Sequence, residues 1–227
     1  MVVDYGDLVK QKGLGTSHLY AAELIAPDSQ VLDIGCASGY LAEILKQKNC
    51  SVTGVELNPK AADQARRTCK NVIEGSIEDK TVLGSIKDKY EYILMLDVLE
   101  HLVDPEAALL NLRSKLKPNG QIIISLPNIA YYAHRLSLFF LGRFEYQESG
   151  IFDRTHLHFY TLNSAQKLFK SRGYRVKDIL VNSSGLIQPN EGKRLKGSFW
   201  SGLAKFLCLH FFPNLFIMHA TFVIEPV

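Results

Sequence analysis

VLDIGCASGY, residues 31–40, is the stretch that decides the fold. An apolar run ends in Asp33, a glycine-rich turn follows, and a helix is expected to begin at the end of the turn. Glycine lets the backbone approach a ligand closely, and the free amides of a helix N-terminus attract anionic or dipolar groups. The glycines are spaced GxxxG and not GxGxxG, which disfavours a dinucleotide. Asp33 would repel a pyrophosphate, but it suits a ligand that carries an ammonium group.

A second carboxylate, Glu56, ends the run TGVE at residues 53–56. It follows the glycine turn by roughly 20 residues, where a carboxylate can accept both hydroxyls of a ribose at the ligand-binding edge of a doubly wound sheet. The alternatives are structural: a tight turn without a ligand, and an exposed carboxylate at a strand end. The combination of the turn with Glu56 favours ligand binding.

Short β-branched runs alternate with segments of helical spacing over the first two-thirds of the chain. This alternation predicts an α/β, doubly wound, Rossmann-like fold with a mostly parallel sheet and helices on both faces. Asn58 and Asp104 each precede a proline, which is typical of a capped helix start. Asn119-Gly120 predicts a tight turn into a strand. The predicted strands are Gln30–Ile34, Ser51–Val55, Asn71–Ile73, Tyr90–Leu96 and Gln121–Leu126, and the predicted helices are Gly39–Lys48, Asn58–Cys69 and Pro105–Leu116.

The pattern changes after Pro127. Residues 128–160 are rich in aromatic side chains and residues 182–213 are irregular, so both are interpreted as insertions in a single domain spanning residues 1–227. A further helix is predicted at Asn163–Gly173, with its cap near Thr161 or Asn163. The remaining strands are predicted at Tyr174–Val181 and Ile217–Ile224.

Composition disfavours several classes of protein. The 227 residues carry 26 basic and 23 acidic side chains, a net charge of +3, which gives no reason to expect nucleic acid. The four cysteines form no CxxC pair, so neither a zinc-site spacing nor a disulfide scaffold is indicated. The N-terminal residues lack the apolar core of a signal peptide, and no run of about 18 apolar residues predicts a membrane span. A cytoplasmic protein is therefore expected.

Five motifs, in order, resemble the class I S-adenosylmethionine-dependent methyltransferases: VLDIGCASGY, GVELNP, EGSIED, LMLDVLEHLVDP and LKPNGQIIISLPN. The resemblance covers residues 28–128 and weakens towards the end of the chain. It implies a seven-stranded sheet whose last strand is antiparallel. It also implies S-adenosyl-L-methionine as cofactor and S-adenosyl-L-homocysteine as product.

The resemblance assigns roles to residues along the expected ligand edge. Asp33 would lie near the ammonium group of the methionine part, Glu56 would hold the ribose, and Leu57 would pack on the adenine. The remaining cofactor-binding residues that it implies are Gly35, Cys36 and Gly39 around the methionine part, Ser76 and Ile77 at the adenine edge, and Leu96 and Asp97 under the ligand.

Two positions depart from the family pattern. Ala37 replaces the middle glycine of DxGxGxG, which is tolerable if its backbone dihedrals are ordinary. Ser76 replaces the usual acidic residue of the third motif, so adenine recognition there would rely on backbone groups or on Glu78. The runs LEHL (99–102) and GIFDRTHLHFYT (150–161) resemble a subset that includes ubiquinone-type O-methyltransferases and the methionine-biosynthesis protein W-like group. They do not identify the acceptor.

Methyl transfer to a hydroxyl benefits from a general base, and histidine suits that role. The candidate catalytic residues are His101, which follows the fourth strand, and His156 and His158, which would face the same side of an extended segment. Asp153 could orient one of them. The alternative is that these side chains brace the loop. A metal could also bind there, but no further ligand set is visible and no metal is predicted.

Residues 129–146 mix aromatic and basic side chains and are interpreted as an acceptor lid, helped by residues 182–213; helical packing on the core is the alternative. The acceptor is expected to be a small molecule, a sugar or a lipid-like compound. Apolar residues in this lid and in 199–212 also fit a peripheral membrane contact or a homodimer face. Two other functions stay open: a non-catalytic, cofactor-binding partner protein, and a nicotinamide-dependent oxidoreductase, which the glycine spacing disfavours.

Overall fold

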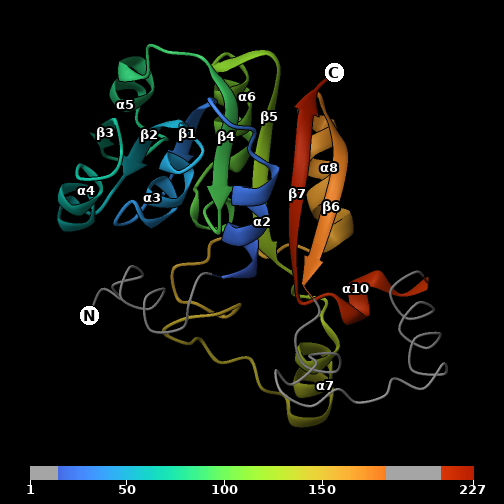
Figure 1. The fold of residues 1–227 in the computed structure, drawn as a ribbon. Coiled ribbons are helices and arrows are strands. Elements are labelled where there is room, and N and C mark those ends of the chain that lie inside the picture. Colours follow the sequence, from blue (N-terminus) through green and yellow to red (C-terminus); the bar gives the residue numbers. More distant parts are fainter. Residues whose placement is uncertain (1–14, 183–210) are drawn as a thin grey trace, which may run out of the picture.

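The computed structural model describes residues 15–182 and 211–227, and it shows a seven-stranded sheet with the order β3-β2-β1-β4-β5-β7-β6 (Figure 1). Strands β1 to β6 run parallel, and β7 runs antiparallel to its neighbours β5 and β6. This confirms the predicted topology. The strands are β1 (Gln30–Ile34), β2 (Ser51–Glu56), β3 (Asn71–Glu74), β4 (Tyr90–Leu96), β5 (Leu116–Pro127), β6 (Tyr174–Asn182) and β7 (His219–Pro226).

Helices cover both faces of the sheet, as predicted. Alternate residues of β1 enter two separate apolar clusters: Val31 packs in one and Leu32 in the other. The first cluster includes residues of α2 (Thr16–Leu24), α3 (Tyr40–Lys46) and α4 (Pro59–Ala65). The second includes residues of α5 (Lys80–Ser85), α6 (Pro105–Arg113) and α8 (Leu162–Ser171). Among the described residues, no helix combines the length and apolarity needed to cross a membrane.

Side-chain caps fix the helix starts that the sequence indicates. Asn58 Oδ1 accepts hydrogen bonds from the amides of Lys60 and Ala61, and Asp104 Oδ1 accepts one from the amide of Ala107. The predicted cap near Thr161 is confirmed, since Thr161 caps α8.

Several element boundaries differ from the prediction by a few residues, and the largest strand difference is at β5. The helix expected to reach Leu116 ends at Arg113, and β5 already begins at Leu116. Asn119 has a positive φ of 63° and lies within this longer strand, where the pairing with β4 shifts register. The Asn-Gly pair therefore makes an irregularity in β5 and does not precede it. Helix α5 was not predicted.

Residues 128–160 leave the sheet and return to it. Asn128 and Tyr160 form an isolated β-bridge, and Asn128 Nδ2 also donates to the carbonyl of Ile217. Between these ends, α7 (Tyr132–Leu141) lies beyond the carboxyl ends of the parallel strands, below the sheet in Figure 1. None of its side chains is buried. The other segment assigned to the lid, 182–213, falls almost wholly outside the described residues.

The direction of β7 matters for the site. An antiparallel strand begins where its parallel neighbours end, so the first residue of β7, His219, pairs with the last residue of β5, Pro127. The carboxyl edge of the sheet thus gathers the ends of β1, β2 and β4 together with the start of β7. The short helix α10 (Pro213–Phe216) leads into that start.

Candidate active site

The turn after β1 needs its two glycines for different contacts. Gly35 has φ +74°, and a Cβ there would stand 2.7 Å from Val98 Cγ2. Gly39 has φ +77°, and its Cβ would stand 2.3 Å from Thr68 Oγ1. Both positions therefore require the left-handed backbone and the missing side chain of glycine. The turn is also tied to β2, because the amide of Gly35 donates to the carbonyl of Val55.

Ala37 has a φ of +46°, which corrects the expectation of ordinary dihedrals at this position. A left-handed conformation brings the alanine Cβ close to the following carbonyl and costs about 1–2 kcal/mol. Ala37 thus keeps the left-handed backbone conformation of the glycine that it replaces, and this conformation is strained for alanine. One compensating contact is present, since the Ala37 amide donates to Glu56 Oε2 over 2.9 Å.

Asp33 lies at the end of β1 with only 4% of its surface exposed. No hydrogen bond to its carboxylate is formed within the described part of the chain. Burial, and secondarily the negative charge of Glu56, raises the pKa of Asp33 to about 7. A buried carboxylate without donors is costly, and a ligand ammonium group would supply the missing positive partner. This is the property expected of a residue that faces the methionine part of the cofactor.

Glu56 joins the turn after β1 to the turn after β2. Its Oε2 accepts from the amide of Ala37 and its Oε1 accepts from the amide of Asn58 over 2.8 Å. Each carboxylate oxygen can accept more than one hydrogen bond, so the group keeps capacity for ribose hydroxyls. Leu57, next in the chain, is 70% exposed and leaves an apolar surface for an adenine ring.

Other predicted cofactor residues contribute through their backbone. The side chains of Cys36 and Ile77 are buried in the two apolar clusters, so only their main-chain groups can face a ligand. Ser76 Oγ accepts from the amide of Glu78. Both carboxylate oxygens of Glu78 accept from backbone amides, those of Val103 and Asp104. Glu78 therefore fastens the loop before α6, which leaves backbone groups as the better candidates for adenine recognition.

At the end of β4, Leu96 is buried and Asp97 makes a hydrogen bond with His219 that the sequence analysis missed. His219 Nε2 lies 2.6 Å from Asp97 Oδ1, and Ser125 Oγ donates to the same oxygen over 2.9 Å. Burial raises the pKa of Asp97, but the adjacent His219 outweighs burial and brings it below its usual range. Burial lowers the pKa of His219, but Asp97 reverses this and raises it overall. The predicted antiparallel last strand was the signal that could have placed His219 at this edge.

A second pair of side chains, from the helices α2 and α3, lies near Asp97 and His219. His18 of α2 and Tyr40 of α3 are joined through Nε2 and the phenolic oxygen over 2.6 Å. Burial lowers the pKa of His18, and the charges of Asp97 and His219 also act on it. Burial, followed by the charge of Asp33, raises the pKa of Tyr40. The bond of His18 to Tyr40 is consistent with a structural role for His18 beside the site.

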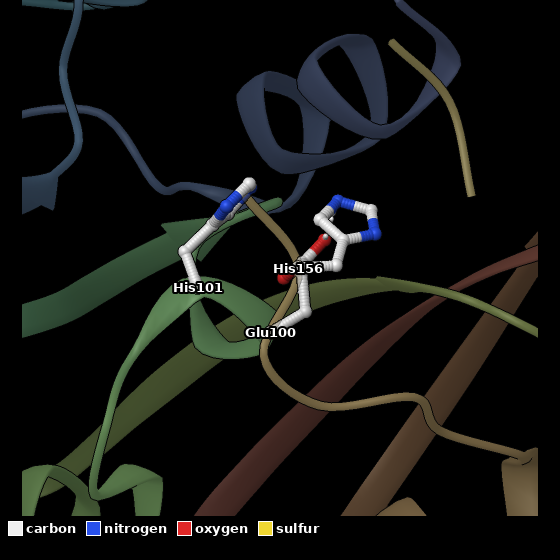
Figure 2. A group of neighbouring side chains, drawn as sticks. All are labelled: Glu100, His101 and His156. Carbon is white, nitrogen blue, oxygen red and sulfur yellow. Dashed lines mark ion pairs between the residues drawn. The ribbon is translucent and has the colours of Figure 1, made fainter. Parts of the chain in front are cut away.

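The three histidines predicted as candidate bases do not share one environment. His101, from the short 3-10 helix η1 (Leu99–His101), and His156 stack edge to face with ring centres 4.7 Å apart, and Glu100 lies beside them (Figure 2). His158 instead stacks on Tyr160 and lines a shallow surface pocket with Leu168 and the start of α6. The structure therefore brings His101 and His156 together and places His158 elsewhere.

Asp153 positions one of these rings indirectly. Its Oδ1 accepts from Thr155 Oγ1 over 2.6 Å, and Thr155 Oγ1 lies 3.0 Å from His101 Nδ1. The amides of Leu157 and His158 both donate to the carbonyl oxygen of Glu100, which fastens this segment to η1. The contact joins residues that are more than fifty positions apart, so sequence spacing could not reveal it.

Comparisons with known proteins agree with this geometry. A family model described as "Methyltransferase domain" matches residues 10–179, and the chain belongs to this family. The mitochondrial ubiquinone biosynthesis O-methyltransferase of Schizosaccharomyces pombe is 32% identical over 114 residues, which cover 48% of this chain and 42% of that protein. This chain spans about half the length of the curated relatives that it matches.

Solved structures support the fold. A SAM-dependent methyltransferase from Archaeoglobus fulgidus aligns with a TM-score of 0.62 at 20% identity, covering 99% of this chain and 100% of that one. Magnesium protoporphyrin IX methyltransferase from Synechocystis PCC 6803, solved with bound SAH, aligns with a TM-score of 0.58 at 15% identity, covering 99% and 84%. The resemblance to class I S-adenosylmethionine-dependent methyltransferases is thereby confirmed, and S-adenosyl-L-methionine is the cofactor of that class.

Proposed function

We propose that this chain transfers the methyl group of S-adenosyl-L-methionine to a hydroxyl oxygen of a small-molecule acceptor. The observation that carries the proposal is the buried Asp33 carboxylate, which accepts no hydrogen bond from any described residue and lies beside the glycine turn and Glu56. The named activity of the ubiquinone biosynthesis relatives favours oxygen as the methylated atom. The glycine spacing argues against a nicotinamide cofactor.

The reaction is an in-line displacement at a carbon that is already activated by the sulfonium. As the oxygen–carbon bond forms, the carbon–sulfur bond breaks, S-adenosyl-L-homocysteine leaves as a neutral thioether, and the acceptor hydroxyl loses its proton. The protein's part is therefore to align the reactants, exclude water and accept that proton.

We assign the proton acceptor to His219. Its Nε2 is held by Asp97, so Nδ1 is the nitrogen that takes up the proton, and the carboxylate stabilises the resulting cation. The carboxylate of Asp97 also raises the pKa of His219, which makes the imidazole a stronger base. His101 and His156 are alternative bases within this proposal, while His158 stacks on Tyr160 and lines a separate surface pocket.

The segment 128–160 is proposed as part of the acceptor site. Helix α7 lies beyond the carboxyl edge and exposes Phe139 and Phe140 by 79% and 71%. Such aromatic surface suits an acceptor with an apolar part, and the same surface would support a peripheral membrane contact or a homodimer. A cytoplasmic location remains part of this proposal.

The test is methyl transfer from cofactor labelled in its methyl group to a panel of phenols, sugars and lipid-like alcohols. We expect label in at least one hydroxyl acceptor, and loss of that label in Glu56→Ala. His219→Gln should lower turnover while leaving cofactor affinity close to that of the wild type. Tight cofactor binding without transfer to any acceptor class would contradict the proposal and support the non-catalytic partner protein.

A further inference from the structure

Two buried cysteines meet behind the glycine turn of the proposed cofactor site. Cys36 belongs to the turn itself, between Gly35 and Ala37, and Cys69 lies in the segment that joins α4 to β3. Both are free thiols, only 2% and 7% exposed, and both lie in the apolar cluster that includes residues of α2, α3 and α4. The pair therefore connects the turn to the segment after α4.

Gly54 of β2 provides the space that the two sulfur atoms share. A Cβ at this position would stand 2.5 Å from Cys36 Sγ and 3.4 Å from Cys69 Sγ. The first distance is too short for atoms in contact, so any other residue at position 54 would displace the Cys36 sulfur. A hydrogen bond with the Cys69 side chain is the largest cause that raises the pKa of Cys36, followed by burial. The two sulfurs therefore lie side by side over the same glycine.

The segment after α4 also contacts the backbone of the turn. Thr68 Oγ1 donates to the carbonyl of Gly39 over 3.0 Å, and the amide of Gly39 donates to the carbonyl of Cys36 over 2.9 Å. On the other side of Cys36, the amide of Ala37 donates to Glu56. A displacement of Cys36 is therefore transmitted to the backbone around which the cofactor is proposed to bind.

We propose that Cys36 and Cys69 form a reversible disulfide bond that weakens cofactor binding at the adjacent turn, with hydrogen peroxide as the oxidant. The sulfur of Cys69 attacks a peroxide oxygen, the oxygen–oxygen bond breaks, and a sulfenic acid and one water are formed. The sulfur of Cys36 then attacks the sulfur of Cys69, the sulfur–oxygen bond breaks, and the hydroxide leaves with the proton of Cys36 as a second water. The two thiols are oxidised by two electrons, and the peroxide is reduced by the same two.

Cys69 is the thiol that reacts first. It is the more exposed of the two and lies outside any helix or strand, so a local opening exposes it without breaking the sheet. Cys36 keeps its proton, because its neighbour and its burial raise its pKa, and it serves as the resolving thiol. Since both thiols are buried, the reaction is slower than at an exposed cysteine.

The bond changes the turn because the sulfur atoms of a disulfide are only about 2.0 Å apart, closer than any non-bonded pair. Cys36 and Cys69 must therefore move together, which draws the turn towards the segment after α4 and disturbs the contact between the Ala37 amide and Glu56. Loss of one hydrogen bond to a charged group corresponds to about a tenfold loss of affinity or more. This effect rests on the proposed function, whereas formation of the disulfide does not.

The experiment treats the reduced, whole chain with hydrogen peroxide, removes the excess with catalase and blocks the remaining thiols with N-ethylmaleimide. We expect peptide mass spectrometry under non-reducing conditions to find Cys36 and Cys69 joined, with the mass of two hydrogen atoms lost. Calorimetry should find that the oxidised chain binds S-adenosylmethionine about tenfold more weakly than the reduced chain. Dithiothreitol should restore the affinity.

Cys69→Ala removes one partner outside the proposed cofactor site. In the reduced state it should bind S-adenosylmethionine as the wild type does, and it should keep that affinity after peroxide treatment. Cys50→Ala is the matched control, because the Cys50 sulfur contacts the carbonyls of Ala26 and Lys48 instead, and it should respond to peroxide as the wild type does. Circular dichroism and thermal melting identify variants that fail to fold, and Cys69→Ser is the second variant at this position.

The inference is overturned if treated, folded wild type contains no link between Cys36 and Cys69, or if the linked protein binds the cofactor as tightly as the reduced protein. It is also overturned if folded Cys69→Ala loses as much affinity as the wild type, since peroxide would then act elsewhere. Absence of binding by the reduced chain would contradict the proposed function instead, and the peptide analysis would still decide whether the disulfide forms.

Discussion

The proposed cofactor site and the histidine cluster of His101 and His156 lie at the same edge of the sheet but are built differently. The proposed cofactor site comes from two short runs, residues 31–40 and 53–57, each of which folds around its own strand end. The cluster joins η1 to a segment more than fifty residues away through backbone hydrogen bonds to the carbonyl of Glu100. The proposed cofactor site can therefore be predicted from the sequence, whereas the histidine cluster forms only where residues 128–160 return to the sheet.

The largest loss of stability is expected when a side chain is added where the turn after β1 needs glycine. Gly39→Ala places a Cβ 2.3 Å from Thr68 Oγ1 and 3.0 Å from Ala65 Cα, in a left-handed backbone. We expect this substitution to lower the free energy of unfolding by about 2–4 kcal/mol. Chemical denaturation measures it. Gly84→Ala is the control, because nothing lies within 4 Å of that position, and equal losses in both variants would show that the turn is not closely packed.

Cofactor affinity should depend on Glu56, the carboxylate at the end of β2 in the proposed cofactor site. Glu56→Ala removes the ribose partner and the acceptor for the amides of Ala37 and Asn58, so affinity for S-adenosylmethionine should fall by about 1–3 kcal/mol. Calorimetry measures the change. Glu74→Ala alters the carboxylate at the paired position of the next strand, where it meets Arg66, and should have no effect. An unchanged affinity in folded Glu56→Ala would refute the ribose assignment.

The pH dependence of stability should separate Asp33 from ordinary surface carboxylates. Its pKa is raised from 3.8 to about 7 in the folded chain, so the folded state holds a proton that the unfolded state has already lost. Stability of the ligand-free protein should therefore fall as pH rises from 4 to 7, and then level off. Asp33→Asn removes this dependence, and above pH 7 it should be more stable than the wild type by on the order of 2 kcal/mol.

The same substitution should weaken cofactor binding, because the ammonium group loses its partner. Urea denaturation at several pH values and calorimetry at one pH test the two halves of the prediction. Asp88→Asn changes an exposed carboxylate and serves as the control. Parallel pH profiles for Asp33→Asn and the wild type would contradict the proposed state of Asp33.

In the histidine cluster, Thr155→Val tests the link between Asp153 and His101. It removes the hydroxyl that contacts both side chains, at a cost of about 1 kcal/mol in stability. Denaturation measures this cost. Calorimetry should find cofactor affinity unchanged, because the proposed cofactor site is built from other segments. A loss of affinity as large as that of Glu56→Ala would mean that the two regions are not independent.

The smallest effect is expected at Ala37. Ala37→Gly relieves the left-handed strain at φ +46°, partly offset by the greater entropy of an unfolded glycine, and should stabilise the chain by about 0.5 kcal/mol. Ala62→Gly, in the interior of α4, should instead destabilise it by about 1 kcal/mol. If Ala37→Gly is as destabilising as this control, the backbone at residue 37 is not strained.

A feature could be predicted from the sequence when its signal is local, and could not be predicted when it depends on distant residues. The strands, the caps at Asn58 and Asp104, and the glycine turn depend on neighbours within a few residues, and all of them are found. The positive φ of Ala37 has no signal in its own residue type, because alanine rarely adopts it. It accompanies a hydrogen bond from the amide of Ala37 to Glu56 on the adjacent strand, a contact between residues far apart in the sequence.

His219 and Glu100 show the other limit. His219 reaches Asp97 through strand order, because β7 inserts between β5 and β6. Glu100 stands in the motif LEHL, but only the return of residues 153–158 reveals its burial and its histidine neighbour. The sequence shows that both residues are present, but only the tertiary structure shows which side chains surround them.

Titration calorimetry of the wild-type chain with S-adenosylmethionine, alongside a titration with NAD, tests the central claim most directly. The account predicts saturable binding of one S-adenosylmethionine per chain and no saturable binding of NAD. Binding of NAD in preference to S-adenosylmethionine, or no binding of S-adenosylmethionine to folded protein, would contradict it.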